Sequence, residues 1–285
     1  MRVMSKVGLV LEGGALRGIF TAGVLDFLLE QNIYFQYVVG VSAGSGNAVN
    51  FVARQIGRSK KVITHEDTKS YYGMEQLKES RKLLNLDVLV DDYALNVFPL
   101  DFDTYFASDT FCECVVTNCI TGEAEYLSSD GDRDRLLLNC KASCAVPFAC
   151  QPVLIENVPY LDGSISDGIP IEHAMKQGCD KLVVVLTKPA GSSATDYSKI
   201  KRVIGLKYQR KYPNLCSTMI SRKASYDKQM EALLELEREG KALILRPQDN
   251  TVGHFENDSS KLNECYEMGY KYTEEQFERL REFMM

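Results

Sequence analysis

Residues 38–46 read Val-Val-Gly-Val-Ser-Ala-Gly-Ser-Gly, and this stretch decides the fold. It opens on a β-branched run typical of a buried strand, and residues 43–54 then carry apolar side chains at helical spacing. A strand that turns sharply into a helix crowds its own backbone, so the positions beside the apex need residues without a Cβ. Gly40 and Gly44 meet this need and leave Ser42 at the apex. The pattern predicts a nucleophile elbow at the end of a strand.

A glycine-rich loop lies upstream of the elbow. Val7–Leu11 reads as an apolar strand, and residues 12–18 (Glu-Gly-Gly-Ala-Leu-Arg-Gly) separate it from an amphipathic helix that leaves Asp26 and Glu30 for solvent. Backbone N–H groups ahead of a helix form a cradle for an anion, either a phosphate or a developing oxyanion. The loop lacks the ending of a P-loop and the glycine spacing of a dinucleotide site, which disfavours nucleotide binding. A serine elbow one helix and one strand later favours the oxyanion.

A serine nucleophile needs a base, and the chain has three histidines. The order Ser42, Asp162, His254 matches that of α/β-hydrolases, but in that fold several strands precede the elbow, and here there is room for one strand and one helix. His65 lies in a polar stretch that indicates exposed surface, and His173 reads as an ordinary residue in the first turn of a helix. His254 remains the best histidine candidate.

An aspartate turn supplies another candidate base. Asp162 and Gly163 follow a short apolar run, and an Asp-Gly pair is also common in turns where the aspartate bonds its own backbone. Asp167 is a rival carboxylate five residues later, and we expect it to cap the helix that begins near Pro170.

Together these segments resemble the patatin-like phospholipase family. Its members carry an Asp-Gly-Gly-Gly-x-Arg-Gly loop, a Gly-x-Ser-x-Gly elbow and a later Asp-Gly-Gly/Ala turn. This chain has residues 12–18, 40–44 and 162–164 in that order, and residues 142–147 (Ala-Ser-Cys-Ala-Val-Pro) are similar to a further stretch of the family. The resemblance covers roughly residues 5–190.

The resemblance implies a serine–aspartate dyad that needs no histidine, with Ser42 as nucleophile and Asp162 as base. It also implies that the backbone N–H groups of Gly13, Gly14 and Ala15 form the oxyanion hole. An ordinary aspartate is a weak base at neutral pH, so we expect Asp162 to be desolvated, which raises its pKa. The supporting residues implied by the motifs are Arg17, Gly18, Gly40, Gly44 and Gly163.

The chain departs from the family pattern at three positions. Ala15 replaces the third glycine, and because a Cβ is disfavoured at positive φ, we expect a negative φ there. Glu12 replaces the aspartate, and we expect its side chain to bond the backbone of its own loop. Ser164 replaces the small residue after Asp162 and Gly163.

Composition bounds the classes of function. At 285 residues, 45% hydrophobic and 25% charged, the chain is an ordinary globular protein, and its net charge of −6 argues against nucleic acid as a partner. The N-terminal apolar run is short and belongs to a core strand, so we expect neither a signal peptide nor a transmembrane span. Nine cysteines without a metal-like pair fit reduced thiols and a cytoplasmic location. We expect no cofactor and no metal, calcium included.

Strands that alternate with helices predict a three-layer α/β/α fold with a mainly parallel sheet. Phe111–Asn118 and Lys181–Thr187 are further expected strands. We expect a catalytic core over residues 1–190 with a helical insertion at 55–105, and a C-terminal region at 191–285 that is part of the same domain or an appended subdomain. The C-terminal region is expected to contain a helix over 226–239, a strand over 241–246 and two helices over 259–283.

Two surfaces have open interpretations. The stretches 71–74 and 97–100 either line an acyl pocket or pack locally, and we favour local packing. The basic region 201–223 either contacts anionic lipid headgroups at a membrane periphery or forms a solvated helix face, and we favour the solvated face.

These features predict a serine hydrolase that cleaves carboxylic esters of acyl lipids, of the phospholipase A, lysophospholipase or esterase type. Two alternatives use the same residues. An acyltransferase would use the same dyad with an alcohol in place of water, and a non-catalytic protein would keep the scaffold and bind an anion at residues 13–18.

Overall fold

The computed structural model describes residues 6–65, 68, 70–73, 76–78, 81–249, 252–253, 256 and 258–285. In this part of the chain eight strands form one sheet in the order β5-β6-β3-β2-β1-β7-β8, with β4 paired to β3 off this path. The strands are β1 (Val7–Leu11), β2 (Tyr37–Val41), β3 (Phe111–Asn118), β4 (Ala124–Leu127), β5 (Val153–Ile155), β6 (Val158–Asp162), β7 (Lys181–Val185) and β8 (Ala242–Leu245).

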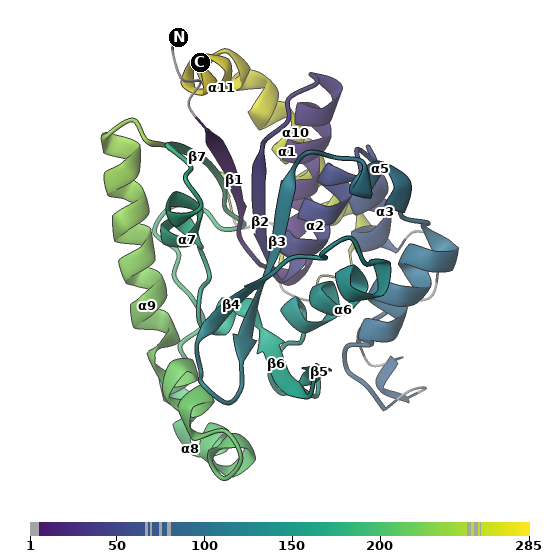
Figure 1. Cartoon of the computed structure of the whole chain (residues 1–285), viewed down its shortest axis with the longest axis vertical. Coiled ribbons are helices and arrows are strands. Elements are labelled where there is room, and N and C mark those ends of the chain that lie inside the picture. The colour runs from purple at the N-terminus through teal and green to yellow at the C-terminus, as the bar shows by residue number, and fades with distance from the viewer. Residues whose placement is uncertain are drawn as a thin grey trace.

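Helices cover both faces of this sheet (Figure 1). The α-helices are α1 (Gly18–Glu30), α2 (Ala43–Val52), α3 (Arg58–Thr64), α5 (Phe102–Phe106), α6 (Arg133–Ser143), α7 (Ile171–Lys176), α8 (Lys201–Ile204), α9 (Pro213–Arg238), α10 (Ser259–Glu275) and α11 (Phe277–Met284). Short helical segments of other types are η1 (Ala15–Arg17), η2 (Asp87–Val97), η3 (Gly163–Ile165), η4 (Tyr197–Ile200) and η5 (Gly205–Gln209).

The layers confirm the expected three-layer α/β/α fold. Pairs β1–β2, β2–β3, β1–β7 and β7–β8 are parallel, whereas β3–β4, β3–β6 and β5–β6 are antiparallel. Helices α7 and α9 lie on one face, and α1, α2, α6 and α10 lie on the other (Figure 1). The strands Val7–Leu11 and Phe111–Asn118 have their predicted bounds. The helix expected to begin at residue 226 begins earlier, at Pro213.

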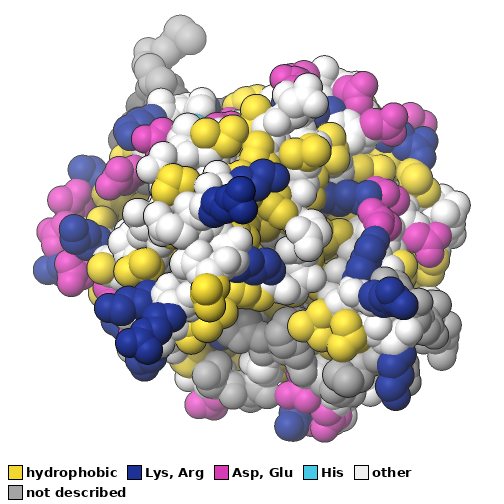
Figure 2. Space-filling view, turned by 90° about the horizontal axis from the view of Figure 1, so that it is seen from below, with side chains coloured by type: hydrophobic (Ala, Val, Ile, Leu, Met, Phe, Trp, Pro, Cys, Tyr) yellow, Lys and Arg dark blue, Asp and Glu magenta, His cyan; other side chains and the backbone are white. Residues whose placement is uncertain are grey.

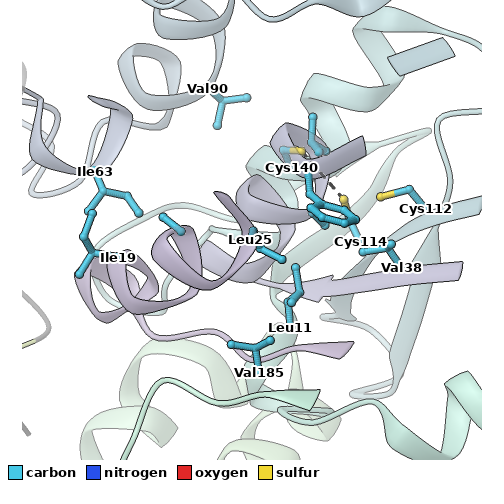
Figure 3. Close-up of a cluster of buried hydrophobic side chains, with 14 of the residues drawn as sticks. Leu11, Ile19, Leu25, Val38, Ile63, Val90, Cys112, Cys114, Cys140 and Val185 are labelled. Atoms are coloured by element: carbon cyan, nitrogen blue, oxygen red, sulfur yellow. Dashed lines mark hydrogen bonds between the residues drawn. The ribbon is translucent and has the colours of Figure 1, made fainter. Parts of the chain in front are cut away.

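Alternation along the central strands fills a core on each side of the sheet. All residues of β1 are buried, with Leu9 and Leu11 in the core under α1 and Val10 in the core under α7 and α9. Figure 3 shows the first of these cores, where Leu11 lies near Leu25 of α1. A strand buried on both faces is typical of a parallel sheet.

Helix α10 packs on α1 through a pair of glycines. A Cβ on Gly23 would overlap the carbonyl oxygen of Tyr266, and a Cβ on Gly269 would overlap the carbonyl oxygen of Phe20. Only residues without a side chain allow two helix backbones to come this close. The contact thus fixes α10 directly against the helix that follows the glycine-rich loop.

The expected exposure of Asp26 is wrong, because α10 covers this part of α1. Asp26 is 2% exposed, and its carboxylate accepts hydrogen bonds from the Tyr266 hydroxyl at 2.8 Å and the Gly57 N–H at 2.9 Å. Burial raises the pKa of Asp26 to about 6, against the lowering effect of those two hydrogen bonds.

All nine cysteines lie in the described part of the chain, where none forms a disulfide, and most of them are buried. They serve there as small apolar side chains.

Candidate active site

Ser42 lies between β2 and α2 at a sharp turn. Its backbone has φ 54° and ψ −123°, a conformation that a residue with a side chain rarely adopts. A Cβ on Gly40 would overlap the backbone of Gly44, and a Cβ on Gly44 would overlap the Leu11 carbonyl oxygen, so both positions need a residue without a side chain. Ser42 is 7% exposed and lies at the N-terminus of α2. This geometry is that of a strained strand-turn-helix elbow.

Asp162 ends β6, two strands from Ser42. Strands β6 and β2 flank β3 in the sheet, and the Ser42 side chain lies near enough to Asp162 to influence the pKa of that carboxyl. Asp162 is 3% exposed, as expected for a desolvated carboxyl. Burial raises its pKa, and the neighbouring Ser42 and Ser164 groups together with the positive charge of Arg222 oppose that rise. Gly163 follows in η3, with its backbone against that of β3.

The stretch 142–147 ties these two residues together. The Ser143 hydroxyl accepts a hydrogen bond from the Ser42 N–H at 2.9 Å and donates one to the Val115 carbonyl oxygen at 2.7 Å. The Ala145 carbonyl oxygen accepts the Asp162 N–H at 3.0 Å. Ser143 is thus a site residue whose role the sequence does not reveal, although its motif is visible there.

The glycine-rich loop lies at the end of β1, next to the elbow. A Cβ on Gly13 would lie 3.0 Å from the Ser42 Cβ, so this part of the loop abuts the serine. Gly14 packs against Thr187, and Gly18 begins α1 against Ala43. The loop is therefore close enough to the elbow to offer backbone donors to a group bound at Ser42.

Two expectations about this loop are wrong. Ala15 has φ 51°, in the left-handed region, so the alanine retains the conformation for which a glycine is preferred. The Glu12 carboxylate does not bond its own loop: it accepts the Thr187 N–H at 2.7 Å and the Tyr226 hydroxyl at 2.7 Å, and it pairs with the Lys188 ammonium at 2.8 Å. Glu12 instead links the loop to the segment that follows β7 and to α9.

Arg17 lies near this buried carboxylate. Burial lowers the pKa of Arg17, and the negative charge of Glu12 opposes that change.

The histidines do not join Ser42 and Asp162 in the described part of the chain. His173 Nε2 lies 2.8 Å from Glu113 Oε2, and its ring stacks on Tyr126 with centroids 3.4 Å apart. His65 is half-buried rather than exposed, with its ring edge-on to two tyrosines. His254 lies outside the described residues.

The expected helix cap at Asp167 is also wrong. Its carboxylate accepts hydrogen bonds from the Tyr126 hydroxyl at 2.6 Å and the Gln229 side chain at 2.7 Å. Helix α7 starts after Pro170 with no side-chain cap.

A largely apolar cavity of about 140 Å³ opens at Ser42. The insertion contributes Tyr71, Tyr72 and Leu100 to its wall, so these residues line a pocket at the serine and do not merely pack locally. Met74 lies outside the described residues. The remaining lining includes Ala15, Gly46, Val49, Ile63, Val90 and Val146.

A serine on a strained turn, a buried carboxylate, nearby backbone N–H groups and an apolar cavity are components that acyl-group chemistry can use. Among the residues that the structure places, no group of three or more His, Cys, Asp or Glu side chains is arranged to hold a metal ion. Within the same residues, no helix combines the length and the apolar character needed to cross a bilayer.

Comparison with known proteins adds to this geometry. The sequence model of patatin-like phospholipases matches residues 9–175, and that of a domain of unknown function (DUF6363) matches residues 212–285. The uncharacterized protein YjjU of Escherichia coli is 34% identical over 209 residues, which are 70% of this chain and 57% of YjjU. Lysophospholipase nte1 of Aspergillus terreus is 25% identical over 303 residues, which are 97% of this chain and 18% of nte1.

The chain thus spans less than two thirds of the length of either relative. Among solved structures, VipD from Legionella pneumophila aligns over 95% of this chain and 67% of its own, with a TM-score of 0.47 and 16% identity.

Proposed function

The chain belongs to the patatin-like phospholipase family, and from that membership we propose that it hydrolyses carboxylic esters of acyl lipids, with Ser42 as nucleophile and Asp162 as general base. The observation that carries the proposal is the proximity of a serine on a strained turn to a buried carboxylate. The relative named a lysophospholipase favours a lysophospholipid as the substrate class.

In this mechanism Asp162 accepts the Ser42 proton while Oγ attacks the ester carbonyl carbon. The carbonyl π electrons move to oxygen, and the N–H groups of Gly13, Gly14 and Ala15 stabilise that oxyanion, each donor being worth roughly a hundredfold in rate. Collapse expels the alcohol, which takes the proton from Asp162. Water then attacks the acyl-enzyme with the same base, and release of the carboxylic acid restores Ser42.

A fluorophosphonate probe tests the nucleophile. We expect an adduct on Ser42 in the wild-type protein and none in Ser42→Ala. Asp162→Asn should label far more slowly and lose about 10²- to 10⁴-fold in ester hydrolysis. A correctly folded wild-type protein without an adduct on Ser42 would exclude the hydrolase and leave the anion-binding alternative.

Two further measurements separate the remaining alternatives. Analysis of products in the presence of added alcohol distinguishes hydrolysis, which releases free acid, from acyl transfer, which forms a new ester. His254→Ala should retain activity if the dyad is correct. Loss of activity in His254→Ala but not in Asp162→Asn would instead identify the histidine as the base.

The cavity at Ser42 is the proposed site of the acyl chain. A dry cavity of about 150 Å³ holds one benzene molecule, so a cavity of this size holds the first six or so carbons of a chain. Gly46 lines it, and a Cβ there would meet no atom within 4 Å. Gly46→Leu should therefore lower kcat/KM for hexanoyl esters by about tenfold and spare acetyl esters. An equal loss for both esters would place the chain elsewhere.

The basic tip, residues 201–211, is the proposed contact with an anionic membrane surface within the wider basic region 201–223. Residues 197–226 include no Asp or Glu, although the net charge of the whole chain is −6. Leu206 is 91% exposed and Val203 is 51% exposed. Figure 1 shows α8 protruding at the end of the molecule toward which β1 and β2 run, and Figure 2, seen from that end, shows Lys and Arg among hydrophobic side chains. Basic and apolar groups together suit a lipid interface.

Sedimentation with vesicles tests this contact. We expect binding to vesicles that contain phosphatidylserine, weaker binding to neutral phosphatidylcholine, and loss of binding at high salt. The double variant Val203→Ser, Leu206→Ser should bind several-fold less. The matched control is Ile56→Ser. Ile56 is an exposed isoleucine that follows the C-terminal end of α2, the end away from Ser42. Unchanged binding by the double variant would remove the basic tip as the contact.

A further inference from the structure

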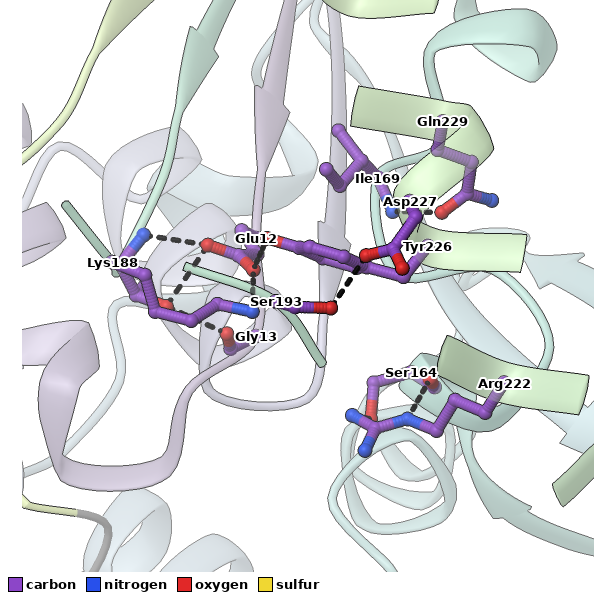
Figure 4. A network of polar contacts seen from close by, with 11 residues as sticks. Glu12, Gly13, Ser164, Ile169, Lys188, Ser193, Arg222, Tyr226, Asp227 and Gln229 are labelled. Carbon is purple, nitrogen blue, oxygen red and sulfur yellow. Dashed lines mark hydrogen bonds and ion pairs between the residues drawn. The ribbon is translucent and has the colours of Figure 1, made fainter. Parts of the chain in front are cut away.

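Helix α9 points three polar side chains at the catalytic segments. Arg222, Tyr226 and Gln229 are spaced by four and three residues, so they lie on one face of the helix. Figure 4 shows this face turned toward Glu12, which follows β1, and toward Ser164 and Ile169, which follow β6. All three side chains lie in the region that matches a domain of unknown function.

Arg222 holds the turn that carries Asp162. Its Nε donates to the Ser164 carbonyl oxygen at 2.6 Å, and its Nη2 lies 3.1 Å from the Ser164 hydroxyl. The Ser164 N–H in turn donates to Asp162 Oδ1 at 2.8 Å. A two-pronged guanidinium contact fixes the direction of a peptide group better than a single bond does. Arg222 therefore influences the position of Asp162 through Ser164.

Tyr226 holds the glycine-rich loop at its first residue. Its hydroxyl donates to Glu12 Oε1 at 2.7 Å, and the Lys188 ammonium lies 3.9 Å from the centre of its ring. The Thr187 hydroxyl completes the link, with contacts to Glu12 Oε2 at 3.0 Å and the Gly13 carbonyl oxygen at 2.8 Å. The loop is thus fixed at the residue before Gly13, which abuts Ser42.

Gln229 contacts the segment after the aspartate turn. Its side chain donates to Asp167 at 2.7 Å and accepts the Ile169 N–H at 3.3 Å. One helix face thereby contacts the loop before Ser42, the turn of Asp162 and the segment that follows it.

We propose that α9 sets the geometry of both halves of the site, with Arg222 as a positioning residue for Asp162 and Tyr226 as a positioning residue for the loop at Gly13, an inference that rests on the Ser42–Asp162 chemistry proposed above. The two contacts act on different parts of the reaction. Arg222 positions the base, and Tyr226 positions the backbone donors that stabilise the oxyanion. Their loss should have different kinetic signatures.

The charge of Arg222 makes its contact visible in a pH profile. The positive charge lowers the pKa of Asp162, which burial otherwise raises. The groups that face Asp162 from the surrounding elements are Ser42, Ser164, Arg222, Cys144, Cys150 and Tyr197. Because the carboxylate is the active form of the base, kcat/KM falls as pH drops through this pKa. Removal of the positive charge moves that fall to higher pH.

Arg222→Gln should therefore shift the acid limb of kcat/KM upward by about 1 pH unit and lower kcat at neutral pH by about tenfold. Arg222→Lys keeps the charge but loses the two-pronged contact, so its acid limb should stay in place while kcat falls. The Lys variant also serves as the test if the Gln variant fails to fold. Arg238→Gln, at an exposed arginine farther along α9, is the matched control. Arg222 variants with the control's profile and kcat would overturn the role of Arg222.

Tyr226→Phe removes one hydroxyl and leaves the ring under Lys188. We expect kcat to fall about tenfold at every pH, with the acid limb and the melting temperature close to wild type. An unchanged kcat, or a fall that appears only at acid pH, would overturn the role of Tyr226.

Failure of the proposed function looks different from failure of this inference. If Ser42 is not labelled, or if Asp162→Asn is fully active, the dyad is wrong. If Ser42 is labelled and Asp162→Asn is inactive, but the Arg222 and Tyr226 variants match wild type, only the role of α9 is wrong.

Discussion

Helices α9 and α10 attach to the sheet in different ways, although both lie in the C-terminal part of the chain. Helix α9 covers one face and reaches the candidate site through long polar side chains such as Arg222 and Tyr226. Helix α10 lies on the other face, where its backbone meets α1 at Gly269 and Gly23 (Figure 1). The polar side-chain ends of α9 fix the positions of a few atoms in the site. The close backbone contact between α10 and α1 buries apolar surface over several turns. On the α9 side these polar contacts bear on the geometry of the site, and on the α10 side the glycine contact bears on the stability of the fold.

The largest expected effect is on the α10 side. Gly269→Val places a branched side chain where even a Cβ overlaps the Phe20 carbonyl oxygen, so the helices must separate. We expect a loss of at least about 4 kcal/mol in the free energy of unfolding, measured by urea titration. Gly46→Ala, where a Cβ meets no atom within 4 Å, is the control and should unfold within about 1 kcal/mol of wild type. A Gly269→Val protein as stable as this control would show that the glycine contact is dispensable.

The next effect lies where α9 meets the glycine-rich loop. Glu12→Gln leaves the Lys188 ammonium, whose side chain is 10% exposed, without its carboxylate. We expect a loss of about 3 kcal/mol in stability, because a buried charge loses its partner. The double variant Glu12→Gln, Lys188→Met should regain part of this loss. If Glu12→Gln and the double variant are both as stable as wild type, the ion pair contributes nothing to stability.

A pH-dependent change in stability is expected on the α10 side. The pKa of Asp26 is raised to about 6 from 3.8, so the folded protein binds this proton more tightly than the unfolded chain. The free energy of unfolding should therefore fall by about 2–3 kcal/mol as pH rises from about 4 to about 6, and then level off. Asp26→Asn should remove this fall.

Urea titrations between pH 4 and pH 7 measure this effect, with Asp109→Asn at an exposed aspartate as control. A slope that persists in Asp26→Asn would assign it to another group. On this view α10 confers pH-dependent stability through Asp26, whereas α9 confers pH-dependent activity through Arg222.

The smallest effect is expected within the loop that α9 holds. Ala15 has φ 51°, which costs an alanine about 1 kcal/mol relative to glycine. Glycine, however, loses more backbone entropy on folding, by a similar amount. Ala15→Gly should therefore change the free energy of unfolding by less than about 0.5 kcal/mol. A stabilisation well above 1 kcal/mol would mean that the alanine strains the loop more than its φ indicates.

The sequence predicts those features whose cause lies within one short stretch. The runs at Val7–Leu11 and Phe111–Asn118 become strands with the expected bounds, because alternation and β-branching act locally. Ser42 is found through its flanking glycines, and Asp162 through an Asp-Gly turn in a known order of motifs. The burial of Asp162 follows from its position at the end of a strand inside the sheet.

The sequence does not reveal contacts between distant residues. Tyr226 and Glu12 are 214 residues apart, and Ser143 and Ser42 are 101 apart, so no local period or spacing links them. Asp167 fails as a helix cap because Tyr126 and Gln229, from other elements, take its carboxylate. The expected negative φ at Ala15 is wrong. The loop is fixed at both ends, and these contacts outweigh the preference of alanine for a negative φ.

The place of β8 in the sheet has a consequence for how the gene can be divided. β8 (Ala242–Leu245) follows α9 in the chain and pairs in parallel with β7 (Lys181–Val185), so the edge of the central sheet is completed by residues beyond the phospholipase match. A fragment that stops at residue 190 would leave β7 as an open hydrophobic edge, which invites aggregation. The two matched regions therefore cannot be exchanged or expressed as independent modules, and recombination between related genes should preserve them as a pair.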